Sequence, residues 1–276
     1  MGDSLNLILT SHNPRTKLMT PALIEEISVE QMEKIYRDRL VDAGDFTFFI
    51  VGNMDEAAVK PLVEKYIGSL TDLPRKENWK DNNVKGPKGK TVKQIMIPMQ
   101  VNKATVIVNY NKQAAFDSRS NMLLNIVKGI LNLRYLEEIR EKEGGSYGVS
   151  VRSNNDHFPK AEKTVQMMFD ADPERSAHLK SIIYQEIDKI IANGPTAEDM
   201  DKVIKNLQKD REQSKLHNAY WMGALVGFYQ DKINNDAPEN FENILTTVTR
   251  DEVKKFTAGF FKSADLVDVV FLPAKK

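Results

Sequence analysis

The sequence predicts an α+β fold, a largely antiparallel sheet with helices packed on one of its faces. Strand-like apolar runs occur as neighbours along the chain, residues 92–97 with 104–110 and residues 147–151 with 164–169. Because each pair is joined by a short connection, we expect antiparallel pairing within it. The helical segments between and after these pairs each carry one apolar stripe, which indicates a layer of helices on one face of the sheet.

The composition is that of an ordinary globular protein and excludes several classes. The 276 residues include 39 Lys and Arg against 39 Asp and Glu, with a formal net charge of zero and no cysteine. A balanced charge argues against a nucleic-acid partner, since such proteins carry a basic excess that captures phosphates. Without cysteine there is no disulfide, no thiolate zinc site and no Cys nucleophile. No apolar run approaches the ~20 residues of a transmembrane helix, so we expect no membrane span.

The first part of the chain predicts a helix, a buried strand and a second helix. Residues 28–31, Ser-Val-Glu-Gln, have the pattern of a capping box, and apolar residues follow at helical spacing. The run from Phe46 to Val51 is expected to be a buried strand. Asp55 can cap the next helix, which ends at Gly68.

The second part predicts further helices and a final strand besides the two strand pairs. A long helix spans about 117–141, and another begins at Asp172-Pro173, where a capping residue precedes a proline. A third helix begins after Thr196, and a fourth begins at a capping box, Thr249 to Glu252, before strand 266–272. Aromatic residues in the helical stretch between these two are expected in the core or at a subunit interface: Trp221, Phe228 and Tyr229.

The end of the chain is similar to its beginning, at low identity. A shift of 221 positions, with no gap, lays Ser28 on Thr249 and Val51 on Leu272. A chance similarity between two helix–strand units is the alternative to a true internal repeat.

The repeat, if true, divides the chain into two parts of unequal length. Residues 1–75 would be the C-terminal tail of a preceding homologous α/β unit, so we expect the chain to be truncated at its start. Residues 76–90, which are polar and hold Pro87, would be a linker. Residues 91–276 would form a complete domain.

The stretch from Leu136 to Val149 is the most informative for chemistry. Arg140 lies in the last turn of the long predicted helix, where a cation is favourable. Gly144-Gly145 permits a tight reversal, after which Tyr147 and Gly148 begin a strand. A guanidinium and a phenol over one cleft would suit a carbonyl or an oxyanion, because both donate hydrogen bonds. The alternative is that Arg140 pairs with a nearby acid such as Glu137, and Tyr147 packs in the sheet.

This stretch resembles a motif of the insulinase/pitrilysin type of zinc metallopeptidases, which includes mitochondrial processing peptidase. In that motif a helix ending in Ile-Arg-Glu-Lys, as at 139–142, is followed by a Gly-rich turn and a Tyr. Arg140 and Tyr147 match its Arg and Tyr at the right separation. Segments 27–55, 66–70 and 191–199 are similar to other family segments in the same order.

The resemblance implies a LuxS/mitochondrial processing peptidase-like metallohydrolase fold and a two-half enzyme that hydrolyses peptides. One half holds zinc, and the facing half holds and polarises the substrate. Carried over, Arg140 would bind a backbone carbonyl of the peptide substrate, and Tyr147 would donate its phenol to the scissile carbonyl. Gly148 would line the cleft. This chain would be the C-terminal, non-zinc half, with the zinc-bearing half as its partner in the same longer chain or in a separate subunit.

The histidines do not match the family's zinc site, an inverted His-x-x-Glu-His on a helix. The four histidines, His12, His157, His178 and His217, lie far apart in the sequence. Two histidines of a helical zinc site must lie on one face within about one turn. We therefore assign no metal ligand and no cofactor to this chain, expect zinc in the partner half, and expect the chain alone to be inactive.

Two other interpretations remain open. The chain could be a non-catalytic homologue, a structural or peptide-binding subunit of a larger assembly. It could also be an unrelated α+β binding module. Because bacterial proteins with this pattern are often exported, the resemblance weakly favours the periplasm.

Overall fold

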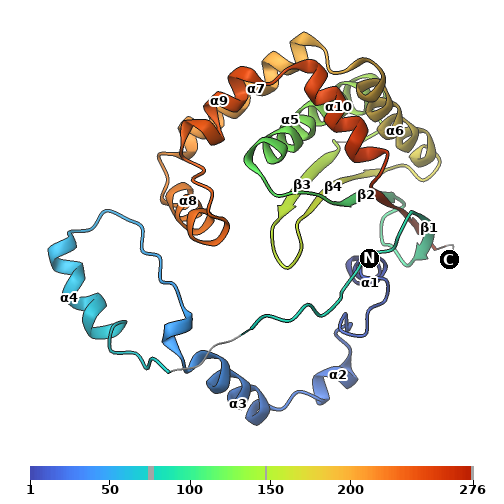
Figure 1. Cartoon of the computed structure of the whole chain (residues 1–276). Coiled ribbons are helices and arrows are strands. Elements are labelled where there is room, and N and C mark those ends of the chain that lie inside the picture. The colour runs from blue at the N-terminus through green and yellow to red at the C-terminus, as the bar shows by residue number, and fades with distance from the viewer. Residues whose placement is uncertain (74–77, 147, 275–276) are drawn as a thin grey trace.

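The computed structural model describes residues 1–73, 78–146 and 148–274. It consists of a sheet domain, formed by residues 90–273, and an extended N-terminal arm, residues 1–73 (Figure 1). The arm runs out from the sheet domain, and residues 78–89 lead back to it (Figure 1). None of the helices in the described ranges combines the length and the apolarity that crossing a bilayer requires.

A five-stranded, mostly antiparallel sheet is the centre of the sheet domain, as the sequence predicts. The strands lie in the order β1-β5-β2-β4-β3, and only the pair β1 and β5 is parallel. The strands are β1 (Lys90–Ile97), β2 (Ala104–Gln113), β3 (Ser150–Asp156), β4 (Glu162–Ala171) and β5 (Asp265–Pro273).

The predicted pairing of the first two strands is wrong. β5, from the far end of the chain, lies between β1 and β2 and pairs with both. A short connection sets the directions of two strands, but it does not prevent a third strand from entering between them. β5 takes this central place because it is apolar on both faces, with Val269 and Phe271 on one and Leu266 and Val270 on the other.

Helices cover one face of the sheet, which confirms the predicted layer. α5 (Ser118–Tyr135), α6 (Ser176–Asn193) and α10 (Arg250–Phe261) pack together, and α7 (Ala197–Ser214) packs against α5 (Figure 1). The caps predicted at Thr196 and Thr249 are formed, since each side chain accepts a backbone N–H of the following helix, and Asp117 caps α5 in the same way. The helix start predicted at Asp172-Pro173 is wrong, because a turn occupies these residues and α6 begins at Ser176 without a side-chain cap. The main core fills the space between these helices and the sheet.

The long helix continues without a break into a π-helical segment, η2 (Leu136–Lys142), which carries Arg140. The predicted helix over 117–141 is therefore confirmed, with wider turns at its end. Of the strand predicted over residues 147–151, residue 147 lies outside the described residues, and β3 begins at Ser150.

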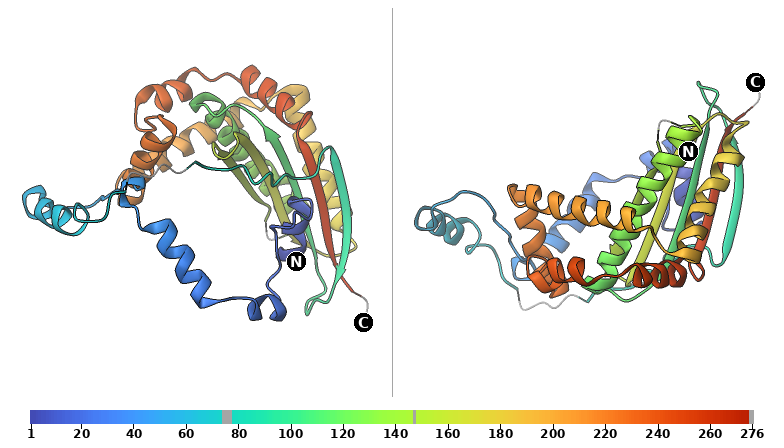
Figure 2. Two further views of the ribbon diagram at one scale, coloured as in Figure 1. Left: turned by 60° about the horizontal axis from the view of Figure 1, so that its bottom comes forward. Right: turned by 90° about the horizontal axis from the view of Figure 1, so that it is seen from above.

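The opposite side of the sheet, which we call the open face, is only partly covered. Thr105, Ile107, Met168, Val267 and Val269 lie on it, as strand alternation requires. α1 (Gly2–Leu9) lies against this face, with Ile8 buried in a small second core (Figure 2).

The N-terminal arm contains the two helices that the sequence predicts. α3 (Val29–Leu40) is capped by the hydroxyl of Ser28, and α4 (Glu56–Tyr66) is capped by the carboxylate of Asp55. A short helix, α2 (Pro21–Glu25), and a 3-10 turn, η1 (Ala43–Asp45), complete the arm. The bounds of α3 and α10 differ by the same 221 positions at both ends, which is the shift of the internal repeat.

The strand predicted at Phe46 to Val51 is absent from the structure, because no other described strand pairs with it. A strand is stable only when its backbone groups bond to a neighbour. Phe46, Phe48 and Ile50 are exposed here, at 41%, 48% and 50%. These residues have the composition of a core strand, but no described sheet pairs with them.

A last group of helices reaches from the sheet domain toward the arm. α8 (Asn218–Asp231) is followed by η3 (Pro238–Asn240) and α9 (Glu242–Thr247). α8 has no buried residue, so the prediction of a core position for its aromatic residues is wrong, and their position at a subunit interface stays a prediction. The ring of Tyr229 contacts Phe49 of the arm. Trp221 and Phe228 are 41% and 50% exposed.

Candidate functional site

Arg140 stands where η2 gives way to the double-glycine turn. The N–H of Gly144 donates to the carbonyl of Arg140 at 3.1 Å, and the N–H of Gly145 donates to that of Ile139 at 3.2 Å. Gly144 has a φ of +57°, the left-handed region that glycine enters without a steric penalty. The helix thus ends at Lys142, two residues after Arg140, and the glycine turn follows.

The guanidinium of Arg140 is exposed and, within the part of the chain that the structure describes, no side chain or carbonyl bonds to it. The nearby acids have other partners. Glu137 bonds to Arg134 at 2.9 Å and to Lys142 at 3.1 Å, and Glu138 bonds to both cations. The hydrogen bond from Lys142 and the charge of Arg134 lower the pKa of Glu137. The alternative pairing of Arg140 with Glu137 is therefore not formed.

Tyr147 lies outside the described residues, so its approach to Arg140 stays a prediction. Gly148, the third residue expected at the site, is described. It lines a cavity of about 620 Å³ at one end of the open face.

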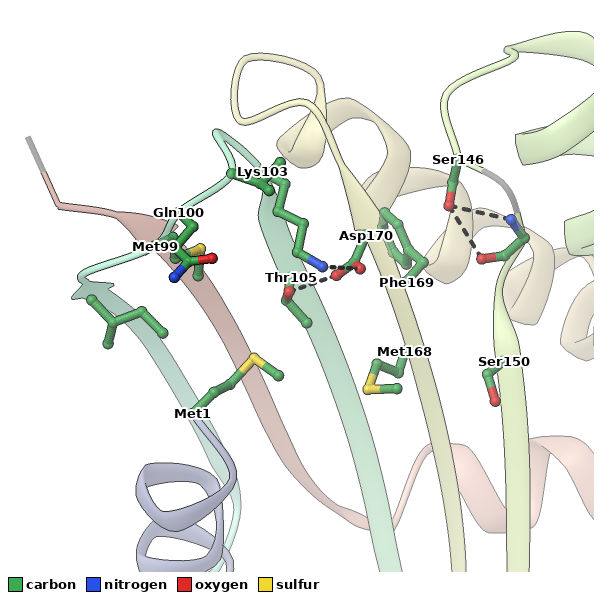
Figure 3. A pocket seen from close by; sticks show the side chains of 13 residues that line it. Met1, Met99, Gln100, Lys103, Thr105, Ser146, Ser150, Met168, Phe169 and Asp170 are labelled. Atoms are coloured by element: carbon green, nitrogen blue, oxygen red, sulfur yellow. Dashed lines mark hydrogen bonds and ion pairs between the residues drawn. The ribbon is translucent and has the colours of Figure 1, made fainter.

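This cavity, which we call the apolar cavity, lies across the ends of four strands (Figure 3). Its walls come from the end of β1 and the loop after it, the start of β2, the end of β4, the start of β3 and the first residue of the chain. The residues that line it are Met1, Ile97, Met99, Gln100, Val101, Lys103, Thr105, Ser146, Gly148, Ser150, Met168, Phe169 and Asp170.

Polar side chains edge the apolar cavity on two sides. Lys103 and the hydroxyl of Thr105 both donate to the carboxylate of Asp170, each at 2.6 Å (Figure 3). Partial burial raises the pKa of Asp170, but these two hydrogen bonds outweigh it and lower the pKa. On the other side, the hydroxyl of Ser146 donates to the carbonyl of Gly148 at 3.2 Å and accepts its N–H at 3.4 Å.

The sequence reasoning missed this cavity, although a signal for it exists. The strand predicted over residues 164–169 stops before Asp170, whereas β4 continues to Ala171. In a strand that continues to Ala171, Met168 and Asp170 face the same way, because side chains alternate. Thr105 was inside a predicted strand, and only its register against Asp170 reveals its role.

The described residues offer no zinc site. Nδ1 of His157 lies 2.8 Å from Asp231, and Nε2 of His178 lies 3.2 Å from Glu143. Each of these histidines thus meets a single carboxylate. Across the described ranges, no group of three His, Cys, Asp or Glu side chains could hold a metal ion. Structural and catalytic zinc sites need three or four protein ligands.

Comparisons with known proteins place these observations in a family. The family described as "Peptidase M16 inactive domain" matches residues 26–207, more than half of the chain. Curated relatives include a "Probable zinc protease PqqL" of Haemophilus influenzae, 27% identical over 165 residues, which are 59% of this chain and 17% of that protein. A "Zinc protease PQQL-like" of Arabidopsis thaliana is 22% identical over 205 residues, 70% of this chain and 21% of that protein.

Solved structures show the same fold. The periplasmic protease PqqL from Escherichia coli matches 99% of this chain and 30% of its own, with a TM-score of 0.79 and 20% identity. A peptidase M16 inactive domain from Pseudomonas fluorescens matches 99% of this chain and 65% of its own, with a TM-score of 0.74 and 18% identity. The chain spans about a fifth of the length of the curated relatives that it matches. Because the family match covers more than half of its residues, the chain belongs to the peptidase M16 family and carries the inactive domain of that family.

Proposed function

We propose that this chain is the substrate-binding, non-zinc half of a zinc metalloendopeptidase. The observation that carries the proposal is the exposed guanidinium of Arg140, which no described residue binds and which lies in the last turn of a helix that a double-glycine turn follows. The family match supports it, as do relatives that are named zinc proteases.

Arg140 and Tyr147 would hold the substrate peptide and stabilise the tetrahedral intermediate. An exposed guanidinium can donate to a backbone carbonyl of the peptide, and its charge would make that hydrogen bond a strong one. The phenol of Tyr147 would donate to the scissile carbonyl oxygen as negative charge develops there. Gly148, which borders the apolar cavity, would leave room for the peptide backbone.

Zinc would be bound by the partner half, where it would activate the attacking water. The described histidines of this chain do not fit a zinc site, because each meets one carboxylate or none. The partner half would lie in the same longer chain or in a separate subunit. That the relatives are several times longer than this chain favours the same chain.

The domain division belongs to the same proposal. Residues 1–75 would be the tail of a preceding homologous unit, 76–90 a linker, and 91–276 a complete domain. The identical lengths of α3 and α10 support this division, and so does the exposed apolar run at Phe46 to Ile50. We further propose a periplasmic location, supported by the E. coli protein, which is named a periplasmic protease.

The experiment compares Arg140→Ala with wild type in the protease that contains this chain together with its zinc-bearing half. Losing a charge-assisted hydrogen bond to the substrate costs roughly 1.5–3 kcal/mol, so kcat/KM should fall by about 10- to 100-fold, largely through KM. Lys255→Ala, which removes an exposed cation of α10 on the helix layer, is the matched control and should cleave like wild type. Equal cleavage by Arg140→Ala would remove the substrate-binding role. A complete protein that cleaves no peptide would instead favour the non-catalytic alternative.

A further inference from the structure

We propose that the apolar cavity is a specificity pocket, which accepts a large apolar side chain of the substrate peptide, such as Leu, Met or Phe. The inference rests on the proposed function and names the substrate class that this half would select. The volume of the apolar cavity, about 620 Å³, lies within the usual range of ligand pockets. One Leu, Met or Phe side chain therefore fits in it with room to adjust.

The lining of the cavity is apolar where a guest side chain would rest. Ile97 and Met99 contribute from β1 and the loop after it, Val101 contributes from that loop, and Met168 contributes from β4. Val101 is 63% exposed, a large apolar side chain left in water. Two methionines beside branched residues give a surface that adapts to guests of different shape, because Met has three rotatable bonds and a polarisable sulfur.

The charges at the edge of the cavity are already neutralised. Lys103 and Asp170 are the charged residues that line it, and they bond to each other at 2.6 Å, with Thr105 as a second donor to the carboxylate. Among the described side chains that line the cavity, a charged side chain of the substrate would find no unpaired counter-charge, and it would lose hydration on entering. The pocket therefore favours an apolar side chain over Asp, Glu, Lys or Arg.

The cavity is continuous with the segment proposed to hold the peptide. Ser146 and Gly148, on either side of Tyr147 in the sequence, form part of its wall. A Cβ placed on Gly148 would meet nothing within 4 Å, so the space beside this backbone is open to a second chain. A peptide held by this segment would pass the mouth of the cavity.

The rest of the open face is lined by more polar residues than the apolar cavity. A second cavity, of about 460 Å³, lies toward the other end of α1 and is lined by polar groups, among them Asn109, Asn111 and Glu162. Apolar recognition is thus concentrated at the end of the sheet that carries Gly148. This asymmetry is what a pocket for one side chain of a bound peptide requires.

The test measures kcat/KM of the complete protease for peptides that differ at one position near the scissile bond, with Leu, Ala, Glu or Lys there. The position is found by scanning in wild type. We expect Leu to exceed Ala by roughly 10-fold or more at one position, since an apolar pocket discriminates by about 10- to 200-fold per methylene-sized change. Met168→Glu should reduce this Leu-to-Ala ratio to about 1 and should raise the ratio of Lys to Leu.

The matched control is Met96→Glu, which places the same charge on a methionine of β1 that is 53% exposed and does not line the cavity. It should keep the wild-type ratio. Met168→Leu, which preserves the apolar floor, should also keep a preference for Leu, and it guards against a folding defect in the Glu variant. A Leu-to-Ala ratio that Met168→Glu leaves unchanged, in an enzyme that cleaves peptides, would overturn the pocket alone. An enzyme that cleaves none of the peptides would overturn the proposed function.

Discussion

The ring of Tyr229 in α8 meets the ring of Phe49 edge to face, with 5.4 Å between the two centroids. This contact joins the sheet domain to the one stretch of the N-terminal arm that has the composition of a core strand. The two residues are 180 positions apart in the sequence, so the contact holds two distant parts of the chain together.

The pair should show a measurable coupling in stability. In a double-mutant cycle of Phe49→Ala and Tyr229→Ala, we expect a coupling free energy of roughly 0.5–1 kcal/mol, because edge-to-face pairs contribute about that much beyond burial. The measurement is chemical denaturation of the four proteins. The control cycle combines Tyr229→Ala with Phe46→Ala, whose ring is outside this contact, and there the two losses of stability should be additive. If the losses for Phe49→Ala and Tyr229→Ala were also additive, the contact would be refuted.

The pair Arg119 and Glu252 should make stability depend on acid pH. The guanidinium donates to both carboxylate oxygens, at 2.5 and 2.6 Å, and these hydrogen bonds lower the pKa of Glu252 below its ordinary 4.5. A lowered folded-state pKa gives stability that is present above the unfolded pKa and is lost as pH falls through the folded value.

The variant Glu252→Gln should therefore be less stable than wild type at pH 7, by roughly 0.5–1 kcal/mol for a half-exposed pair. The difference should shrink below pH 4.5. Urea denaturation at several pH values measures it, with Glu212→Gln on the exposed side of α7 as control. A difference that stays constant down to pH 3 would contradict the assignment.

Arg211 should be a major stabilising residue, although it lies far from the candidate site. Its side chain is 6% exposed, donates to the carbonyls of Asn235 and Asp236, and stacks on the ring of Phe241 at 4.0 Å. Arg211→Met leaves these two carbonyls without the donor that binds them. It also removes the cation that lies 3.0 Å from the carboxylate of Glu242. Breaking a buried charged network costs about 3–5 kcal/mol.

Thermal and chemical denaturation would measure this loss. Lys209→Met, two residues earlier on the exposed side of the same helix, makes a comparable change and should stay within about 0.5 kcal/mol of wild type. If the two variants were equally stable, the network around Arg211 would contribute nothing.

The chain alone should bind no zinc at a dedicated site and should show no chelator-sensitive proteolysis. His157 and His178 each meet one carboxylate, and the described residues form no three-ligand group. Metal analysis after dialysis against zinc is the measurement. One zinc per chain, retained after gel filtration, would contradict the assignment of zinc to the partner half.

The helices could be predicted from the sequence because their signals are local. Ser28, Asp55, Thr196 and Thr249 cap helices where their patterns indicate, since a cap depends on residues three or four positions away. The pattern at Asp172-Pro173 placed the start of α6 four residues too early. The direction of β3 against β4 was predictable for the same reason.

The sheet order was not predictable, because it depends on contacts across the whole chain. Lys90 in β1 pairs with Leu266 in β5, and no local feature of either strand predicts this pairing. The strand expected at Phe46 to Val51 fails for a related reason, since its apolar pattern is real but the structure provides no neighbour for it.

The candidate site was predictable only in its motif. The spacing around Arg140 correctly indicated a helix end and a glycine turn. The apolar cavity beside Gly148 needed the register of β2 against β4, which brings Thr105 to Asp170. The position of Tyr147 stays a prediction.

The central claim, that this half donates hydrogen bonds to the reacting carbonyl, is tested most directly by Tyr147→Phe in the complete protease. Removing one oxyanion donor costs about 10²–10³ in kcat. Tyr184→Phe is the matched control, because that phenol bonds to Asp268 between α6 and β5. The account predicts a loss of kcat of that size with KM nearly unchanged for Tyr147→Phe, and wild-type kcat for the control. A kcat for Tyr147→Phe equal to that of wild type would contradict the account.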